Sequence, residues 1–175
     1  MVSLFPSVYL LNGLLLLPIL LWNWVFATKL PRAFSAEYFE KDIPVFLTWA
    51  ENCLRLAVFI LPLFMPLSLT TQTQKLGLGL YVGGAGIYFL SWSALIIFPE
   101  SGWSRSAAGF LAPAYTPLLW LTGIGLLGSS LYSAIPSHAG TGIIPYWPGI
   151  YLLSAILFTG VHVAHTSIVY LKSIG

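Results

Sequence analysis

The sequence predicts an all-α membrane protein, a bundle of five transmembrane helices in a single domain. Of its 175 residues, 58% are hydrophobic and only 7% are charged, whereas soluble domains carry about 25% charged residues. Apolar runs of about 20 residues, the length that crosses a bilayer as a helix, recur along the chain. The expected spans cover residues 6–27, 44–69, 76–98, 113–135 and 149–171. These spans leave no room for a separate soluble domain.

The composition also excludes several classes of protein. Seven basic and five acidic residues give a net charge of +2, too little for a surface that binds nucleic acid. The single cysteine, Cys53, rules out an internal disulfide and a cysteine-based metal cage. The sequence contains no GxSxG, P-loop or dinucleotide-binding motif, so the soluble enzymes that use them are excluded. Residues 1–6 carry no basic side chain, so we expect the first apolar run to be a retained helix rather than a cleaved signal peptide.

The first two spans are separated by residues 28–42, the most highly charged stretch of the chain. Asp42 followed by Pro44 favours a helix start, because Asp accepts hydrogen bonds from free N–H groups and proline fits the first turn. Pro62 and Pro66 lie in the second half of the second span and predict a bend or an early end there.

The third and fourth spans are rich in glycine. Gly79 and Gly83 form a small-xxx-small pair, which lets another helix approach closely. Pro113 marks the start of the fourth span, which carries further glycines at Gly123 and Gly125. If the close packing occurs between chains, these two spans would bind a second copy of the protein or a partner membrane subunit.

The threading of the five spans follows from the basic residues. The first loop, the third loop and the C-terminus share one side of the bilayer, and they contain Lys29, Arg32, Lys41, Arg105 and Lys172. The opposite side contains Lys75. The positive-inside rule therefore puts the N-terminus outside and the C-terminus in the cytoplasm. We expect the protein to reside in a plasma or inner membrane.

Three polar residues, Glu51, Asn52 and Arg55, interrupt the second span. Ionisable residues inside a membrane are costly and usually have a partner. Glu51 and Arg55 are four residues apart with the acid first, so they share one helical face in the favoured order. Asn52 points about 100° away from Glu51 and can bond to a neighbouring helix. If the ion pair is only structural, exchanging its two residues should preserve most of the stability.

The fifth span carries His162 and His165. At 1.5 Å per residue, they lie about 13 Å and about 9 Å from the cytoplasmic boundary, while Glu51 lies about 10 Å and Arg55 about 16 Å from it. Polar groups at one depth in a small bundle turn towards each other or towards a wet cavity. The loop at residues 100–106 is placed to cover such a cavity.

The leading functional hypothesis is that the protein binds or transports a small polar or amphiphilic ligand, or protons, at this cytoplasm-facing site. Glu51 would exchange a proton or hold a cationic group, Arg55 would hold an anionic group, and the two histidines would titrate near neutral pH. The residues expected to contact the ligand are Glu51, Asn52, Arg55, Arg105, His162 and His165.

Other functions remain open. An intramembrane enzyme for a lipid or isoprenoid would use the histidines as bases and Arg55 with Arg105 to neutralise a phosphate. A non-catalytic subunit of a larger membrane complex is a third alternative, and the glycine-rich third and fourth spans would then be its docking faces. Glu51, His162 and His165 could bind zinc, although the HExxH spacing is missing. His138, expected to be an exposed loop residue on the opposite side, cannot complete a bis-histidine haem site with them, so a haem would need a partner subunit, and the cofactor stays unknown.

Overall fold

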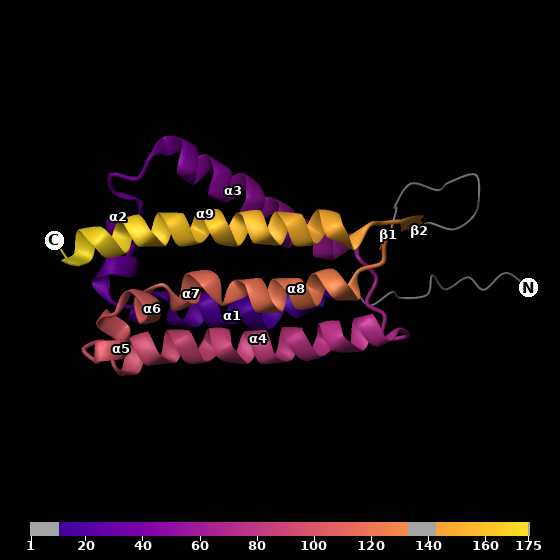
Figure 1. Cartoon of the computed structure of the whole chain (residues 1–175), viewed down its shortest axis with the longest axis horizontal. Coiled ribbons are helices and arrows are strands. Elements are labelled where there is room, and N and C mark those ends of the chain that lie inside the picture. Colours follow the sequence, from indigo (N-terminus) through magenta and orange to yellow (C-terminus); the bar gives the residue numbers. More distant parts are fainter. Residues whose placement is uncertain (1–10, 133–142, 175) are drawn as a thin grey trace, which may run out of the picture.

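The structure is a computed structural model that describes residues 11–132 and 143–174, and these are mostly helical (Figure 1). The longer helices are α1 (Leu16–Phe26), α3 (Val45–Ile60), α4 (Gln72–Ile97), α8 (Pro117–Leu127) and α9 (Pro148–Ile174). The short elements are the 3-10 helices η1 (Asn12–Leu15), η2 (Ala27–Lys29), η3 (Arg32–Phe34) and η4 (Leu61–Phe64), the helices α2 (Ala36–Glu40), α5 (Gly102–Arg105), α6 (Ala107–Phe110) and α7 (Ala112–Tyr115), and the strands β1 (Ser130–Tyr132) and β2 (Ile143–Pro145). Figure 1 shows α4, α8 and α9 side by side, with α3 inclined to α9.

The bundle has two distinct ends. One end, which we term the α2 end, holds α2, α5 and the C-terminal end of α9, while the β1–β2 hairpin lies at the other, the β end (Figure 1). The basic residues predicted to share one side of the bilayer belong to elements at the α2 end or, for Lys41, directly follow one: Lys29, Arg32, Lys41, Arg105 and Lys172. Lys75 lies in the first turn of α4, at the β end.

Within the described residues, three helices are long and apolar enough to cross a membrane: Val45–Phe64, Gln72–Ile97 and Pro148–Ile174. The prediction of a helical protein with helices long and apolar enough to span a membrane is therefore confirmed. The fourth expected span contains the shorter apolar helix Ala112–Leu127. Of the first expected span, residues 6–10 lie outside the described part, and η1 and α1 occupy the remainder.

Two helices end earlier than predicted. The second expected span stops being helical at Phe64 rather than at residue 69, because Pro62 shifts its last turn to a 3-10 helix and Met65 is extended. The fourth ends at Leu127 rather than at residue 135, and β1 follows it. Gly128 there has an extended backbone, and a Cβ atom at this position would overlap the buried Met65 side chain.

Glycine packing joins α4 to α8, although through other glycines than the predicted pair. A Cβ atom on Gly84 would lie 2.6 Å from the backbone nitrogen of Trp120, and one on Gly77 would lie 2.9 Å from the carbonyl oxygen of Gly123. Cβ atoms on Gly79 and Gly83 would meet nothing within 4 Å. These two glycines belong to the opposite, outward face of α4, so they do not pack against any described part of the chain.

Buried tyrosine hydroxyls fix the helices to one another. Tyr81 of α4 donates to the carbonyl oxygen of Leu15 at 2.6 Å, which holds the end of η1, and with it the start of α1, against α4. Tyr151 of α9 donates to the carbonyl oxygen of Val58 at 3.1 Å, which holds α9 against α3. Both bonds satisfy polar groups that would otherwise be buried without partners. They set the positions of α1 and α3 around the site described next.

Candidate functional site

A buried ion-pair cluster forms where α3 meets α9. The side chain of Glu51 is only 2% exposed. Its Oε1 atom lies 3.1 Å from Nδ1 of His162, and its Oε2 atom lies 2.6 Å from Nδ1 of His165. Arg55, one helical turn along α3, donates to the same Oε1 atom. The structure thus brings together the four groups placed at matching depth, and we term them the Glu51 cluster.

His165 lies between two hydrogen-bond acceptors. Its Nε2 atom is 3.1 Å from the carbonyl oxygen of Phe39 in α2, while its Nδ1 atom meets the carboxyl group of Glu51. A carbonyl oxygen only accepts, so Nε2 must carry a hydrogen. The contact between Glu51 and His165 then requires a second hydrogen, either on Nδ1 or on the carboxyl group. The two side chains therefore share one proton in the interior of the bundle.

Arg55 and Asn52 lie on the outer side of the cluster. The Arg55 side chain is 47% exposed, and its Nη1 atom donates to Oδ1 of Asn52 at 3.2 Å. The prediction that Asn52 bonds to a neighbouring helix is wrong, because Asn52 is exposed and bonds within its own helix. A guanidinium group has five N–H groups. Two of those of Arg55 are used here, and the others make no hydrogen bond to a described residue.

Arg55 and His162 also line a cavity of about 370 Å³ among α1, α3, α4, α8 and α9. We term it the aromatic cavity, because its walls include Phe59, Tyr88, Trp92, Trp120 and Phe158. His162 also lines a second cavity of about 200 Å³, which extends to Phe39 and shares Tyr88 and Trp92 with the first. The imidazole of His162 is thus a wall of both cavities as well as a partner of Glu51.

An apolar groove of about 470 Å³ lies between α1 and α3, and we term it the α1–α3 groove. It shares Leu20, Arg55 and Phe59 with the aromatic cavity. Its remaining walls are apolar residues and one glycine: Gly13, Leu16, Leu17, Leu56, Ile60 and Leu63. At the β end the two helices are joined, since the backbone N–H of Asn12 donates to the carbonyl oxygen of Met65 at 2.8 Å. The groove and the aromatic cavity are therefore neighbours that share part of their walls.

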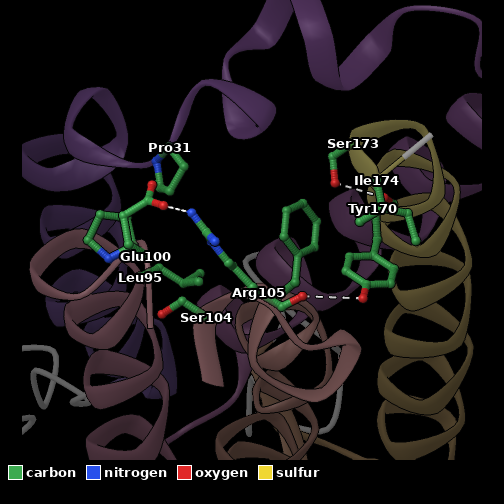
Figure 2. A pocket seen from close by; sticks show the side chains of 10 residues that line it. Pro31, Leu95, Glu100, Ser104, Arg105, Tyr170, Ser173 and Ile174 are labelled. Atoms are coloured by element: carbon green, nitrogen blue, oxygen red, sulfur yellow. Dashed lines mark hydrogen bonds and ion pairs between the residues drawn. The ribbon is translucent and has the colours of Figure 1, made fainter. Parts of the chain in front are cut away.

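Arg105 lies outside both the Glu51 cluster and the aromatic cavity. It forms an exposed ion pair with Glu100, and its carbonyl oxygen accepts a hydrogen bond from the Tyr170 hydroxyl at 3.3 Å. Figure 2 shows these residues around a separate cavity of about 320 Å³ at the α2 end. The loop at residues 100–106 borders that cavity and not the Glu51 cluster, because α5 lies beside the end of α4, where the Ser104 hydroxyl donates to the carbonyl oxygen of Ala94 at 3.3 Å (Figure 1). The structure does not place Arg105 in the predicted site.

The described residues contain no group of three His, Cys, Asp or Glu side chains arranged to hold a metal ion. His162 and His165 direct their Nδ1 atoms at the carboxyl oxygens of Glu51, so these candidate zinc ligands bond to one another. Cys53 is exposed on α3. His138 lies outside the described residues.

Besides Arg55 and His162, the aromatic cavity has four lining residues with polar side-chain atoms, and none of them is among the sequence candidates: Asn23, Tyr88, Trp92 and Trp120. Tyr88 donates its hydroxyl hydrogen to Oδ1 of Asn23 at 2.6 Å. A signal for two of them exists, because Tyr81, Tyr88 and Trp92 recur at a spacing that puts them on one face of α4. The periodicity does not show that this face meets Trp120.

Comparisons with known proteins add no functional information. No family model matches the sequence, and searches of curated proteins and of solved structures found no match.

Proposed function

We propose that the protein binds a small amphiphilic ligand at an intramembrane site formed by the Glu51 cluster and the aromatic cavity. One observation carries the proposal: Arg55 and His162 belong to a buried ion-pair cluster and at the same time line a cavity of about 370 Å³. Ligand sites are typically cavities of about 300–1,000 Å³ with mostly apolar walls and a few polar groups. The α1–α3 groove would hold the apolar part of the ligand.

The proposal includes five membrane-spanning helices, with the α2 end in the cytoplasm of a plasma or inner membrane. The basic residues gathered at the α2 end support this orientation. Ala112–Leu127 would be a short span, since 16 residues extend about 24 Å, less than the roughly 30 Å hydrocarbon core. Bilayers accommodate such a span by local thinning. In this orientation the Glu51 cluster lies closer to the cytoplasmic surface of the membrane than to the outer surface.

Each member of the cluster has a role in this proposal. Arg55 offers positive charge and unused N–H groups to the polar head of the ligand. His162 leaves its Nε2 atom for the ligand, since Nδ1 faces Glu51. Glu51 and His165 share a proton on the side of Glu51 that faces His165, away from the cavity wall formed by His162. This proton can move from one of the two side chains to the other when the ligand enters. Transport of the ligand, with or without a proton, is the expected use of such a site.

An intramembrane enzyme acting on a lipid or isoprenoid is the second candidate. It is favoured by the contact between the Glu51 carboxyl group and Nδ1 of His162, because a carboxylate in this position orients a histidine whose other nitrogen acts as a base. Turnover of a bound lipid that is lost in His162→Gln, while the lipid itself is still retained, would favour the enzyme over the binding protein.

Filling the junction between groove and cavity tests the proposal. Leu20 lines both, so Leu20→Trp should displace the ligand, whereas Leu21→Trp places the same side chain at a 57% exposed position on α1 that lines neither. Native mass spectra of protein released from detergent micelles should show a bound amphiphile for wild type and Leu21→Trp. The bound mass should be absent for Leu20→Trp. Identical spectra for the three proteins would contradict the proposal.

A further inference from the structure

The cavity of about 320 Å³ that Arg105 borders is separate from the ligand site proposed above, and we term it the α2-end cavity. Its walls come from α4, α5, α6 and α9, from the link between α4 and α5, and from Pro31. None of the residues that line it also lines the aromatic cavity or the α1–α3 groove. It is therefore a second place at which a ligand can bind without touching the first.

When α4 and α9 cross a membrane, the α2-end cavity lies at the level of the lipid head groups. The two helices have 26 and 27 residues, so they extend about 39 Å and about 40 Å at 1.5 Å per residue. This length exceeds the roughly 30 Å hydrocarbon core and approaches the roughly 40–45 Å of the whole bilayer. Leu95 and Ile174, near the C-terminal ends of these helices, both line the cavity. Its neighbours in the membrane are therefore phosphate-bearing head groups.

The α2-end cavity presents one positive and one negative side chain. Arg105 and Glu100 form an ion pair, and their side chains are 67% and 75% exposed. Exposed ion pairs contribute little to stability, so a ligand can insert beside this pair or open it at small cost. Only Nη2 of Arg105 bonds to Glu100, and the other guanidinium N–H groups bond to no described residue. Figure 2 shows the pair at one side of the cavity, with Tyr170 and Ser173 at the other.

The three hydroxyl groups in the wall have already used their hydrogens. The Ser104 hydroxyl donates to the carbonyl oxygen of Ala94 at 3.3 Å. The Tyr170 hydroxyl donates to the carbonyl oxygen of Arg105 at 3.3 Å, and the Ser173 hydroxyl donates to that of Tyr170 at 2.7 Å. A hydroxyl that donates elsewhere offers only its lone pairs to a ligand. Among the described residues that line the cavity, Arg105 is thus the one whose side chain can donate to a ligand, and a fitting ligand must bring donors of its own.

We infer that the α2-end cavity binds the head group of a phospholipid that carries a phosphate and a primary ammonium group, as phosphatidylethanolamine does. This second site goes beyond the proposed function and shares with it only the membrane-spanning helices. The phosphate accepts hydrogen bonds from Arg105, and the ammonium group donates to Glu100. A zwitterion that lies antiparallel to the ion pair places each of its charges beside the opposite charge. Leu95, Phe110 and Ile174 contact the apolar part of the lipid next to the phosphate.

Two other common head groups fit this cavity less well. A phosphatidylglycerol head carries a net negative charge, which Glu100 repels, and Arg105 is the one basic residue among the described residues of the wall. A phosphatidylcholine head has a quaternary ammonium group without N–H, so it cannot donate a hydrogen bond to the carboxylate. The α2 end as a whole adds little net charge, since it has five basic and four acidic residues: Lys29, Arg32, Lys41, Arg105, Lys172, Glu37, Glu40, Asp42 and Glu100.

Binding of three lipids to the purified full chain in nonionic detergent tests the inference. Dimyristoyl phosphatidylethanolamine, phosphatidylcholine and phosphatidylglycerol have identical acyl chains, and native mass spectra count the lipid molecules retained at each concentration. We expect phosphatidylethanolamine to bind at least about fivefold more tightly than either of the others, the factor that one exposed ion pair can supply. Glycerophosphoethanolamine, the same head without acyl chains, should not displace it at equal concentration.

Variants of the two charged residues assign the preference to the cavity. Glu100→Gln should remove the preference for phosphatidylethanolamine over phosphatidylglycerol, whereas Arg105→Gln should weaken all three lipids, because each has a phosphate. Arg32→Gln and Glu37→Gln are the matched controls, since they remove the same charges at exposed positions of the α2 end that do not line the cavity. Both controls should keep the preference, and circular dichroism checks that all four variants are folded.

Three results would overturn the inference: equal affinity for the three lipids, a preference that persists in both Glu100→Gln and Arg105→Gln, or displacement by glycerophosphoethanolamine. Leu20→Trp separates this site from the aromatic cavity, because Leu20 does not line the α2-end cavity. The preference for phosphatidylethanolamine should persist in Leu20→Trp, and its loss there would move the lipid to the aromatic cavity and overturn the second site. An amphiphile retained by Leu20→Trp together with an intact lipid preference would contradict the proposed function alone.

Discussion

Glu51→Gln removes the negative charge at the centre of the cluster while it preserves the size of the side chain. Glu51 is 2% exposed and bonds to Arg55, His162 and His165, so the variant leaves buried basic groups without a counter-charge. Removing one partner of a buried ion pair costs about 3–5 kcal/mol, and we expect the free energy of unfolding to fall by that amount. Arg55 is 47% exposed, so Arg55→Gln should cost no more than about 1 kcal/mol, as in surface pairs.

The measurement is reversible unfolding by dodecyl sulfate in mixed micelles, followed by helical circular dichroism. Glu37→Gln, at an exposed position of α2, is the control and should change the free energy of unfolding by less than about 0.5 kcal/mol. The exchange variant Glu51→Arg/Arg55→Glu gives an independent check. It should be strongly destabilised, because an arginine at position 51 would face His162 and His165. A stable exchange variant, or equal costs for Glu51→Gln and Arg55→Gln, would refute the role of Glu51 as the buried centre of the cluster.

Two further predictions concern the fold. Gly84→Ala should lower the free energy of unfolding by about 1–3 kcal/mol through overpacking against the Trp120 backbone, whereas Gly83→Ala has open space and should be neutral or stabilising by up to about 1 kcal/mol in the same unfolding assay. For threading, Ser173→Cys and Thr73→Cys in a background without Cys53 should react with impermeant thiol reagents from opposite sides, Ser173→Cys from the cytoplasm. Both positions are exposed, and labelling of both from one side would exclude the five-span arrangement.

The helical fold could be predicted because apolar runs of membrane length are a local property of the sequence. The residue at which α8 ends could not be predicted in this way. The apolar run continues to Ile135, but the helix stops at Leu127, where Gly128 packs on Met65 from the η4 turn. A contact between segments that far apart leaves no local signal. The outward direction of Gly79 and Gly83 has the same explanation, since only the position of α8 decides which glycines of α4 are covered.

The depth of the candidate site residues in the bilayer could be predicted, but not all of the groups that these residues contact. Helix rise alone puts Glu51, His162 and His165 at one level, and the structure joins them by direct hydrogen bonds. The Phe39 carbonyl oxygen could not be predicted as a partner of His165, because backbone groups carry no sequence signal. The prediction that Arg105 belongs to the site was wrong because the sequence does not determine to which side of the bundle a loop folds. In the structure the Arg105 carbonyl oxygen accepts a hydrogen bond from Tyr170.

The α1–α3 groove opens among half-exposed leucines, including Leu17 and Leu20, rather than at the α2 end. A molecule with an alkyl tail partitions into the bilayer by about 0.8 kcal/mol per methylene group, so it approaches such an opening by two-dimensional diffusion. Occupancy would then follow the mole fraction of the molecule among the surrounding lipids and not its aqueous concentration. Apparent dissociation constants would scale with the amount of detergent or lipid present, and affinities would be comparable only when expressed per mole of amphiphile.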